Sequence, residues 1–202
     1  MKVTKKRLGR AFFQNPDVVE VAKNLLGKII CSNIEGNYCE AMITETEAYA
    51  GQNDKACHAH MGKYTNRTAT MYEKGGTAYV YLCYGIHHLF NIVSNIEGNA
   101  DAVLIRAIEP INGTDIMLNR RNAKDLKPIV FSGPGKLTKA LGIDKSFNAL
   151  DLVNNDTLYI VDNNFNVKDI EKSTRIGIDY AEEDALLPWR FYISGNKFVS
   201  QL

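Results

Sequence analysis

The sequence lacks the features that mark membrane, secreted and zinc-binding proteins. Its 202 residues contain no apolar run of about 18 residues, which a membrane-spanning helix needs. The basic segment 1–10 is not followed by the apolar stretch of a secretion signal. The four cysteines (Cys31, Cys39, Cys57 and Cys83) show no C-x-x-C spacing, which argues against a zinc ribbon, a thioredoxin-type site or a disulfide scaffold. We therefore expect a soluble, cytoplasmic protein with reduced thiols.

The sequence also lacks an excess of charge of either sign. The 24 Lys and Arg residues nearly balance the 23 Asp and Glu residues, which leaves a formal charge of +1. A polyanionic partner would have to be bound by a local basic patch, because the protein as a whole supplies almost no attractive field. There is no internal repeat, low-complexity tract or obvious linker. We expect one domain over residues 1–202.

Periodicity predicts an α+β fold with a largely antiparallel, curved sheet flanked by helices. A helix is expected over 15–28, with Asn15 as its cap and Pro16 in its first turn. Further helices are expected in 112–122 and, behind a Gly-Pro-Gly turn, in 133–143. Seven to nine strands are expected: two within 28–51 around a turn at 34–38, and others in 78–84, 89–94, 102–110, 157–162, 174–179 and 190–195.

The predicted strand that contains TETEAY carries the first candidate for chemistry. Alternation along a strand places Glu45, Glu47 and Tyr49 on one face. A carboxylate at the edge of a concave sheet can serve as a general base when burial raises its pKa. A solvent-facing position is the other interpretation, and for a single glutamate on a strand it is the more common one.

Cys57, His58 and His60 follow closely, and their residue types are those of zinc ligands. The spacing i, i+1, i+3 within a short turn is not a recognised zinc arrangement, however, and no second Cys/His pair completes the coordination. We expect no metal. A neutral His58 in a pocket, with one hydrogen-bond donor and one acceptor, is the better functional interpretation.

Tyrosines and basic residues indicate how a nucleic acid could be held. Tyr79 and Tyr81 share a strand face, and Tyr84 lies near the tip of a tight hairpin that turns at Gly85. Aromatic side chains beside a positive groove bind unstacked bases, and a wedge in the minor groove opens a duplex. The candidate groove residues are Lys63, Arg67, Lys74, Arg106, Arg120, Arg121 and Lys124.

A series of short motifs resembles one known family. ETEAYAG, His58, GTAYVYLCYG, Asn91, LIRAIEP, SGPGKL, KSFN and RFYISG occur in the order and with the spacing of the alkyladenine (3-methyladenine) DNA glycosylases. The resemblance extends from about residue 8 to the C-terminus. It implies a monofunctional base-excision repair enzyme that flips alkylated purines out of duplex DNA and hydrolyses the N-glycosidic bond, leaving an abasic site. It also implies a protruding β-hairpin that inserts into DNA.

The resemblance implies specific roles for residues of the pocket. Glu47 matches the general base that activates water, and Arg106 matches the residue that positions this water with it. Tyr49 and His58 match residues that stack on and hydrogen-bond the flipped base. Tyr81 matches the aromatic residue on the other face of that base.

Further roles concern discrimination and DNA contact. Asn91 matches the residue that discriminates against the exocyclic amine of guanine, and Tyr84 matches the residue that intercalates where the nucleotide was extruded. Arg67 falls where the family has basic residues that contact the DNA backbone. The implied substrates are 3-methyladenine and 7-methylguanine, with hypoxanthine and ethenoadenine as further candidates. No cofactor and no membrane association are expected, and the protein is expected to act as a monomer on damaged double-stranded DNA near the nucleoid.

Two other functions are compatible with the residues alone. One is a non-catalytic binder of damaged or single-stranded nucleic acid that uses the same tyrosines. The other is a glycosidase for small sugars or nucleosides, which usually needs two opposed carboxylates. Glu45 could be the second carboxylate only if it faces the same pocket as Glu47.

Overall fold

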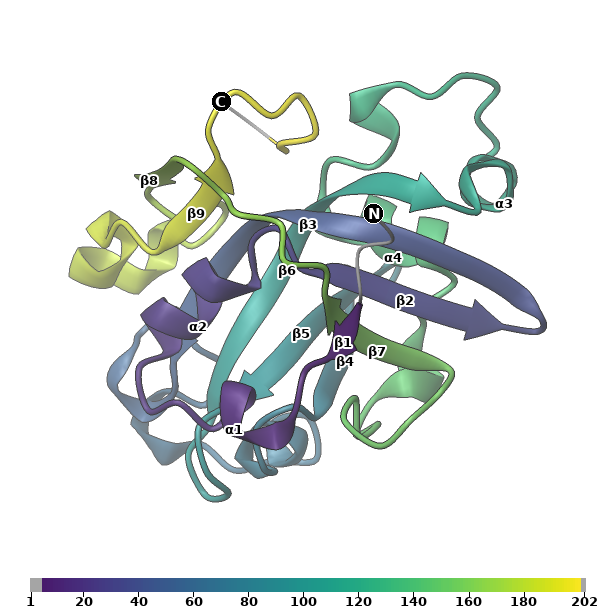
Figure 1. The fold of residues 1–202 in the computed structure, drawn as a ribbon. Helices are drawn as coiled ribbons and strands as arrows, with labels where there is room; N and C mark the ends of the chain where they lie inside the picture. Colours follow the sequence, from purple (N-terminus) through teal and green to yellow (C-terminus); the bar gives the residue numbers. More distant parts are fainter. Residues whose placement is uncertain (1–4, 201–202) are drawn as a thin grey trace.

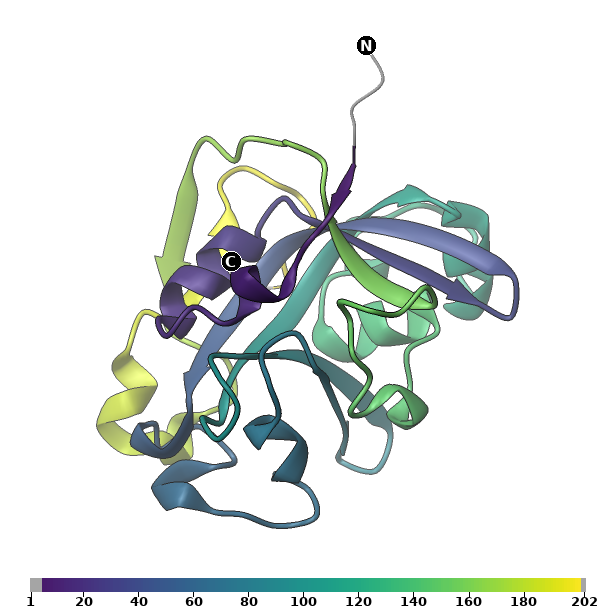
Figure 2. The same ribbon diagram turned by 60° about the horizontal axis from the view of Figure 1, so that its bottom comes forward.

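The strands form one antiparallel sheet in the computed structural model, which describes residues 5–200 (Figures 1 and 2). The strands are β1 (Lys6–Arg7), β2 (Ile29–Ile34), β3 (Asn37–Ala50), β4 (Ala78–Cys83), β5 (His87–Ser94), β6 (Asp101–Asn112), β7 (Leu158–Asp162), β8 (Ile170–Ser173) and β9 (Arg190–Ile193). The α-helices are α1 (Arg10–Phe13), α2 (Val18–Leu25), α3 (Thr114–Arg120) and α4 (Pro134–Leu141). Short 3-10 helices are η1 (Gly51–Asn53), η2 (His60–Gly62), η3 (Ala69–Tyr72), η4 (Pro128–Val130), η5 (Lys145–Phe147) and η6 (Asp179–Leu186).

The long strand β3 is the centre of the sheet. The strand order is β1-β7-β2-β3-β6-β5-β4, and β9 pairs with both β3 and β8. The first half of β3 pairs with β2, residues 45–47 pair with β9, and β6 follows β3 along its other edge. The α+β class and the largely antiparallel open sheet predicted from the sequence are therefore confirmed. In Figure 1 β3 and β6 run through the middle of the molecule.

Two β-bulges decide which side chains of β3 and β6 face the core. The register runs from Ile43 opposite Ile108 to Glu45 opposite Ala107, so Thr44 is an extra residue on β3. It then passes to Thr46 opposite Ile105, so Arg106 is an extra residue on β6. A bulge shifts the alternation of a strand by one residue. As a result, residues 39, 41 and 43 of β3 pack in the main core before the bulge, and residue 48 packs there after it.

Helix α2 covers the core face of β3, as its apolar spacing predicts. Val18, Val21, Ala22 and Leu25 are buried. The cap differs from the prediction, however, because the Asp17 carboxylate accepts hydrogen bonds from the amides of residues 19 and 20. An ionised carboxylate also interacts favourably with the N-terminal end of the helix dipole. The helix is therefore shorter than the predicted segment 15–28.

One predicted strand is longer than expected, and another does not form. Strand β6 continues through Pro110 to Asn112. Proline has no amide hydrogen, and Pro110 is tolerated here because it lies beside a register shift, where the ladder of hydrogen bonds is irregular. The predicted strand 174–179 does not form, and the strand in this region is β8 (Ile170–Ser173). Gly177 has a φ of +76°, and the amide of Ile176 is hydrogen-bonded to a side chain instead of to a neighbouring strand. This segment therefore leaves the sheet and borders the pocket described below.

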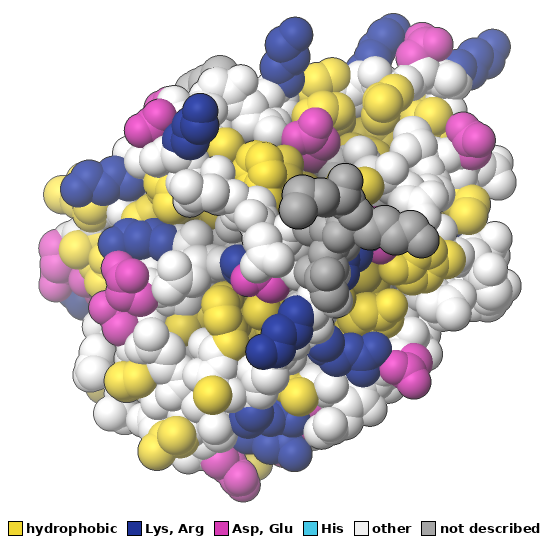
Figure 3. All heavy atoms as spheres, viewed as in Figure 1, with side chains coloured by type: hydrophobic (Ala, Val, Ile, Leu, Met, Phe, Trp, Pro, Cys, Tyr) yellow, Lys and Arg dark blue, Asp and Glu magenta, His cyan; other side chains and the backbone are white. Residues whose placement is uncertain are grey.

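Charges are spread over the face of the molecule that Figure 3 shows. Lys and Arg side chains lie among Asp, Glu and hydrophobic ones and do not gather in one patch there. No histidine is visible on this face, although His87 is exposed and lines the pocket. The pocket therefore opens on another face. The helices of residues 5–200 are all too short or too polar to cross a membrane.

Candidate active site

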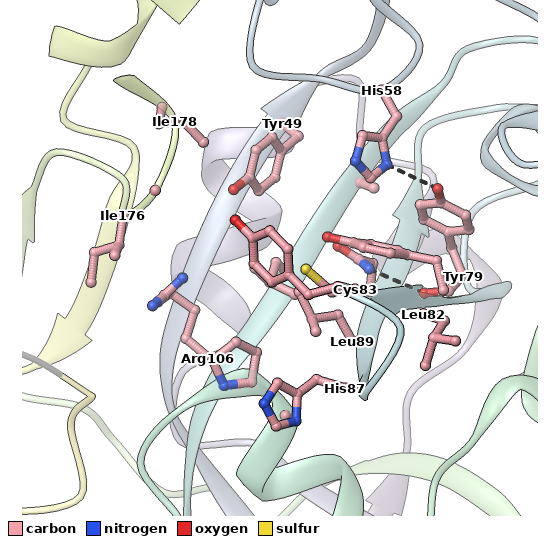
Figure 4. A pocket seen from close by; sticks show the side chains of 18 of the residues that line it. Tyr49, His58, Tyr79, Leu82, Cys83, His87, Leu89, Arg106, Ile176 and Ile178 are labelled. Carbon is pink, nitrogen blue, oxygen red and sulfur yellow. Dashed lines mark hydrogen bonds between the residues drawn. The ribbon is translucent and has the colours of Figure 1, made fainter. Parts of the chain in front are cut away.

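A cavity of about 720 Å³ lies on the face of the sheet opposite α2. Alternate residues of β3, β4, β5 and β6 form its floor, because neighbouring residues on these strands belong to the main core. Its rim comes from the loop 56–71, the β4–β5 turn, the start of α4 and the segment 176–180. Figure 4 shows side chains from these separate segments converging on one space. The cavity has the size of a small-molecule site.

Glu47 lies fully buried directly behind this wall and does not itself line the cavity. Its Oε2 accepts a hydrogen bond from the Tyr49 hydroxyl at 2.8 Å. Its Oε1 accepts one from the amide of Ile176 at 2.8 Å and lies 3.3 Å from Nη1 of Arg106. All three partners line the cavity. Within residues 5–200, two hydrogen bonds and one ion pair thus hold this carboxylate.

Glu45 occupies the same strand face but has a different environment. Its Oε1 accepts from Nε of Arg106 at 3.2 Å, from Nε of Arg190 at 2.6 Å and from the Ser200 hydroxyl at 2.8 Å. The carboxylate is fully buried and does not line the cavity. The predicted shared face of Glu45 and Glu47 is thus present, and Arg106 links the two. The Glu45 carboxylate is already paired with two arginine side chains and is not free to act as a second catalytic carboxylate.

His58 is held as a neutral ring by two hydrogen bonds. Nη2 of Arg67 lies 3.2 Å from Nε2, and because a guanidinium can only donate, Nε2 is the acceptor. Nδ1 therefore carries the proton and donates to the Tyr79 hydroxyl at 2.9 Å (Figure 4). Burial, followed by the charges of Arg67 and Lys63, lowers the pKa of His58 to about 4. The ring thus offers a fixed hydrogen-bonding pattern at neutral pH.

Tyr81 forms an aromatic wall of the pocket together with His58 and Tyr79. The His58 ring meets it edge-on at 4.8 Å, and the Tyr79 ring lies 5.3 Å away. The Arg67 guanidinium is placed 4.8 Å above the Tyr81 ring. Burial raises the pKa of Tyr81 above its ordinary value, so its hydroxyl stays neutral. The rings predicted to hold a base are therefore brought together, with Arg67 among them.

Asn91 lies on β5 between β4 and β6, and it is buried at the pocket wall. Its Nδ2 donates to the carbonyl of Tyr79 at 3.1 Å. This bond fixes the orientation of the amide. One face of a potential ligand would therefore meet a rigid polar group.

Tyr84 lies at the tip of the β4–β5 hairpin and is 91% exposed. Tyr84 and Gly85 both have positive φ, 51° and 72°, and the amide of Ile86 bonds to the carbonyl of Cys83 at 3.2 Å. A left-handed backbone is unfavourable for an aromatic residue and is usual for glycine or asparagine. An exposed ring in a strained turn indicates a function other than packing.

Two residues of the site were missed by sequence reasoning. Ile176 donates its amide to Glu47, and Arg175 packs behind Tyr49. A backbone amide has no signature in the sequence. The glycine within TRIGID was the one available signal, because a glycine inside an apparent strand often marks a bulge or a turn.

No group of three His, Cys, Asp or Glu side chains within residues 5–200 is arranged to hold a metal ion. Cys57 and His60, the candidate ligands nearest to His58, have other partners. The Cys57 thiol lies 3.9 Å from the carbonyl of Ala100, and Nδ1 of His60 lies 3.1 Å from the carbonyl of Gln52.

Comparison with known proteins identifies the family of the chain. The family model described as methylpurine-DNA glycosylase matches residues 11–197. The chain belongs to the methylpurine-DNA glycosylase family. It is 47% identical over 202 residues to a protein of Clostridium tetani named "Putative 3-methyladenine DNA glycosylase", with 96% of this chain and 99% of the relative covered. Proteins of the same name in Clostridium perfringens strain 13 and Borreliella afzelii are 47% and 46% identical; 96% of this chain and 99% and 100% of these relatives are covered.

Membership of the methylpurine-DNA glycosylase family makes DNA the substrate and a DNA glycosylase the kind of enzyme. Three basic residues, Arg67, Arg121 and Lys136, line the pocket. Arg120 is engaged inside the protein, since its Nη1 donates to the carbonyl of Ala140 at 3.3 Å.

Proposed function

We propose that this methylpurine-DNA glycosylase removes 3-methyladenine from duplex DNA by hydrolysis, with Glu47 as the general base. The water oxygen forms a bond to C1′ of the deoxyribose while the C1′–N9 bond breaks. The electron pair of that bond goes to the purine, and Glu47 accepts the proton of the water. Because an N3- or N7-alkylated purine is cationic in DNA, it leaves as a neutral base. The products are the free base and an abasic site.

The observation that carries this proposal is the environment of Glu47. The carboxylate is buried and lies immediately behind the pocket wall, where Tyr49 and Ile176 donate hydrogen bonds to it and Arg106 is ion-paired with it. A water bound beside this carboxylate would be held between Glu47 and Arg106. A fixed nucleophile next to the reacting carbon avoids much of the entropic cost of the reaction. Glu45 cannot replace Glu47, because Arg106, Arg190 and Ser200 occupy it.

The pocket is suited to an extruded purine. Tyr49 and Tyr81 supply flat aromatic surfaces, which favour a cationic base, and His58 supplies a neutral hydrogen-bonding edge. Asn91 is the group that would meet the exocyclic amine of guanine. Hypoxanthine and ethenoadenine are neutral, and their removal depends on how well His58 and Asn91 match their edges. 7-Methylguanine is cationic like 3-methyladenine and is the second expected substrate.

The β4–β5 hairpin is the proposed wedge for base flipping. Tyr84 projects from the strained tip, and Leu82 and Ile86 beside it are also exposed. Apolar and aromatic side chains can enter the base stack and fill the space that the extruded nucleotide leaves. Arg67, at the pocket rim, would then contact the DNA backbone.

Release of 3-methyladenine by a Glu47→Gln variant tests the assignment of the base. We expect release to be abolished while affinity for abasic-site DNA stays near that of the wild type, because glutamine keeps the shape but cannot accept the proton. Glu171→Gln is the matched control, since Glu171 is exposed, does not line the pocket and accepts a hydrogen bond from the Ser194 hydroxyl. Release by Glu47→Gln at the wild-type rate would refute the role of Glu47. Binding without release by the wild type would instead identify a non-catalytic binder.

The substrate range is tested by a panel of duplexes. We expect wild-type protein to release 3-methyladenine and 7-methylguanine, scored as free base. Duplexes with hypoxanthine and ethenoadenine show whether the pocket also accepts neutral lesions. The Glu47→Gln variant, run in parallel, separates enzymatic release from the spontaneous loss of alkylated purines.

A further inference from the structure

Arg175 lies at the back of the pocket, where four segments of the chain meet. Its Nη1 and Nη2 donate to the two oxygens of Asp54, the second at 2.9 Å. Nη1 also donates to the carbonyl of Ala48 at 2.9 Å, and Nη2 to that of Asp184 at 3.1 Å. The side chains of Arg175 and Asp54 are fully buried. Arg175, from the segment after β8, thus forms hydrogen bonds to three other parts of the chain: β3, the turn after η1 and helix η6.

The same guanidinium is stacked between two aromatic rings. Its carbon Cζ lies 4.8 Å from the centroid of the Tyr49 ring and 5.2 Å from that of Trp189. Tyr49 lines the pocket and Arg175 does not, so the guanidinium supports the Tyr49 ring from behind. A planar cation can fix a ring in this way, whereas an ammonium group cannot match both the ring and the carboxylate.

Arg175 is connected to Glu47 along two routes. The first is the ring that it supports, because the Tyr49 hydroxyl donates to Oε2 of Glu47 at 2.8 Å. The second is the backbone, because the next residue, Ile176, donates its amide to Oε1 at 2.8 Å. Both hydrogen bonds to Glu47 therefore depend on the position of one arginine. The Ile176 amide is not fixed by a regular strand, because Ile176 lies outside the sheet.

Stability alone does not account for this arrangement. Nε of Arg175 is buried and has no hydrogen-bond partner among residues 5–200. An unpaired buried donor is costly, and a buried ion pair is often no more stabilising than apolar residues of the same volume. A fully buried arginine with one unsatisfied donor is better explained by what it positions.

We propose that Arg175, paired with Asp54, is a positioning residue for catalysis: it holds the Tyr49 hydroxyl and the Ile176 amide on Glu47, and so fixes the carboxylate toward the water. The proposal rests on the proposed role of Glu47. Arg175 is fully buried and does not line the pocket, so its removal should slow the chemical step and leave DNA affinity nearly unchanged.

The test compares Arg175→Met and Arg175→Lys with the wild type in single-turnover release of 3-methyladenine. Misplacing a catalytic group by about 1 Å can cost about 100-fold in rate, so we expect losses of roughly 30- to 100-fold, with affinity for abasic-site DNA changed by less than about threefold. Arg175→Lys keeps the charge opposite Asp54 but lacks the planar fork, and it should remain slow. Arg10→Met is the matched control, because Arg10 also binds an aspartate, Asp151, through both carboxylate oxygens, and it does not line the pocket.

A double mutant separates positioning from a general loss of stability. If Arg175 acts through Tyr49, the rate loss of Arg175→Lys combined with Tyr49→Phe will be smaller than the product of the two single losses. A wild-type rate for Arg175→Lys, or losses that multiply fully, would overturn the proposal. If Arg175→Met fails to fold, the rates of Arg175→Lys and of the double mutant still test the positioning role. Glu47→Gln is measured in parallel: if it is inactive while Arg175→Lys is not impaired, the base assignment stands and only the positioning role fails.

Discussion

Glu45 and Glu47 lie on the same face of β3, and both contact the guanidinium of Arg106. Arg106 is the extra residue of a β-bulge, which places its side chain between the two carboxylates. Glu47 receives its other hydrogen bonds from residues of the pocket wall, whereas Glu45 receives them from Arg190 and Ser200. We therefore propose a catalytic role for Glu47 and a structural role for Glu45.

Replacing Glu45 tests this division. Glu45→Ala leaves the buried guanidiniums of Arg106 and Arg190 without their common acceptor, and loss of one member of a buried ion pair typically costs about 3–5 kcal/mol. We expect the free energy of unfolding, measured in urea, to fall by this order. The exposed Glu171→Ala should change it little. Equal stability of Glu45→Ala and the wild type would contradict a structural role for this carboxylate.

Tyr84 is expected to show opposite effects on stability and on DNA binding. Tyr84→Asn removes an aromatic residue from a left-handed backbone that asparagine tolerates better, and should stabilise the fold by about 1 kcal/mol. The same variant should bind lesion-containing duplex more weakly, because the wedge is lost. Thermal unfolding and duplex titration measure the two effects. Ile86→Asn is the control at the same tip; Ile86 is not among the residues with positive φ, so no gain in stability is expected. Unchanged affinity of Tyr84→Asn would argue against intercalation.

His58 makes the stability of the protein depend on pH. Its pKa is about 4 in the folded protein and 6.5 in the absence of the fold. As the pH falls below 6.5 the unfolded chain binds a proton first, so stability is full above about pH 6.5 and is lost progressively toward pH 4. The loss approaches about 2–3 kcal/mol at the lower limit. His58→Gln should remove this part of the pH dependence, so the two unfolding curves should converge as the pH falls. A constant difference between them from pH 7 to pH 4 would show that the ring is not held neutral.

The local basic residues predict a moderate salt dependence of DNA binding. Each phosphate contact contributes about one unit to the slope of log affinity against log salt. Lys136→Gln and Arg121→Gln, at the pocket rim, should each reduce this slope by up to about one unit and weaken binding to all duplexes alike. Lys172→Gln, on the exposed strand β8, should leave the slope unchanged. An affinity for duplex DNA that is independent of salt would contradict phosphate contacts at this rim.

The sequence predicted the parts of the site that depend on alternation and motif order. Glu47 and Tyr49 share a face, as strand periodicity indicated. His58, Tyr81 and Asn91, which the family resemblance assigns to the pocket, all line it, and their roles stay predictions. Backbone geometry accounts for what was missed. The Ile176 amide and the support from Arg175 arise where a predicted strand leaves the sheet at Gly177, and no side-chain pattern encodes such a hydrogen bond.

The two bulges also limit how the length of this protein can change. Thr44 and Arg106 are each one residue more than a regular ladder needs, and beyond them the odd and even positions of β3 exchange faces. Deleting a single residue between Ile43 and Glu47 would turn Glu47 toward the apolar core and Ala48 toward the pocket. The number of residues in this strand therefore decides which side chains lie behind the pocket wall. An insertion or deletion in a loop at the pocket rim would change the pocket entrance without exchanging the two faces of the sheet.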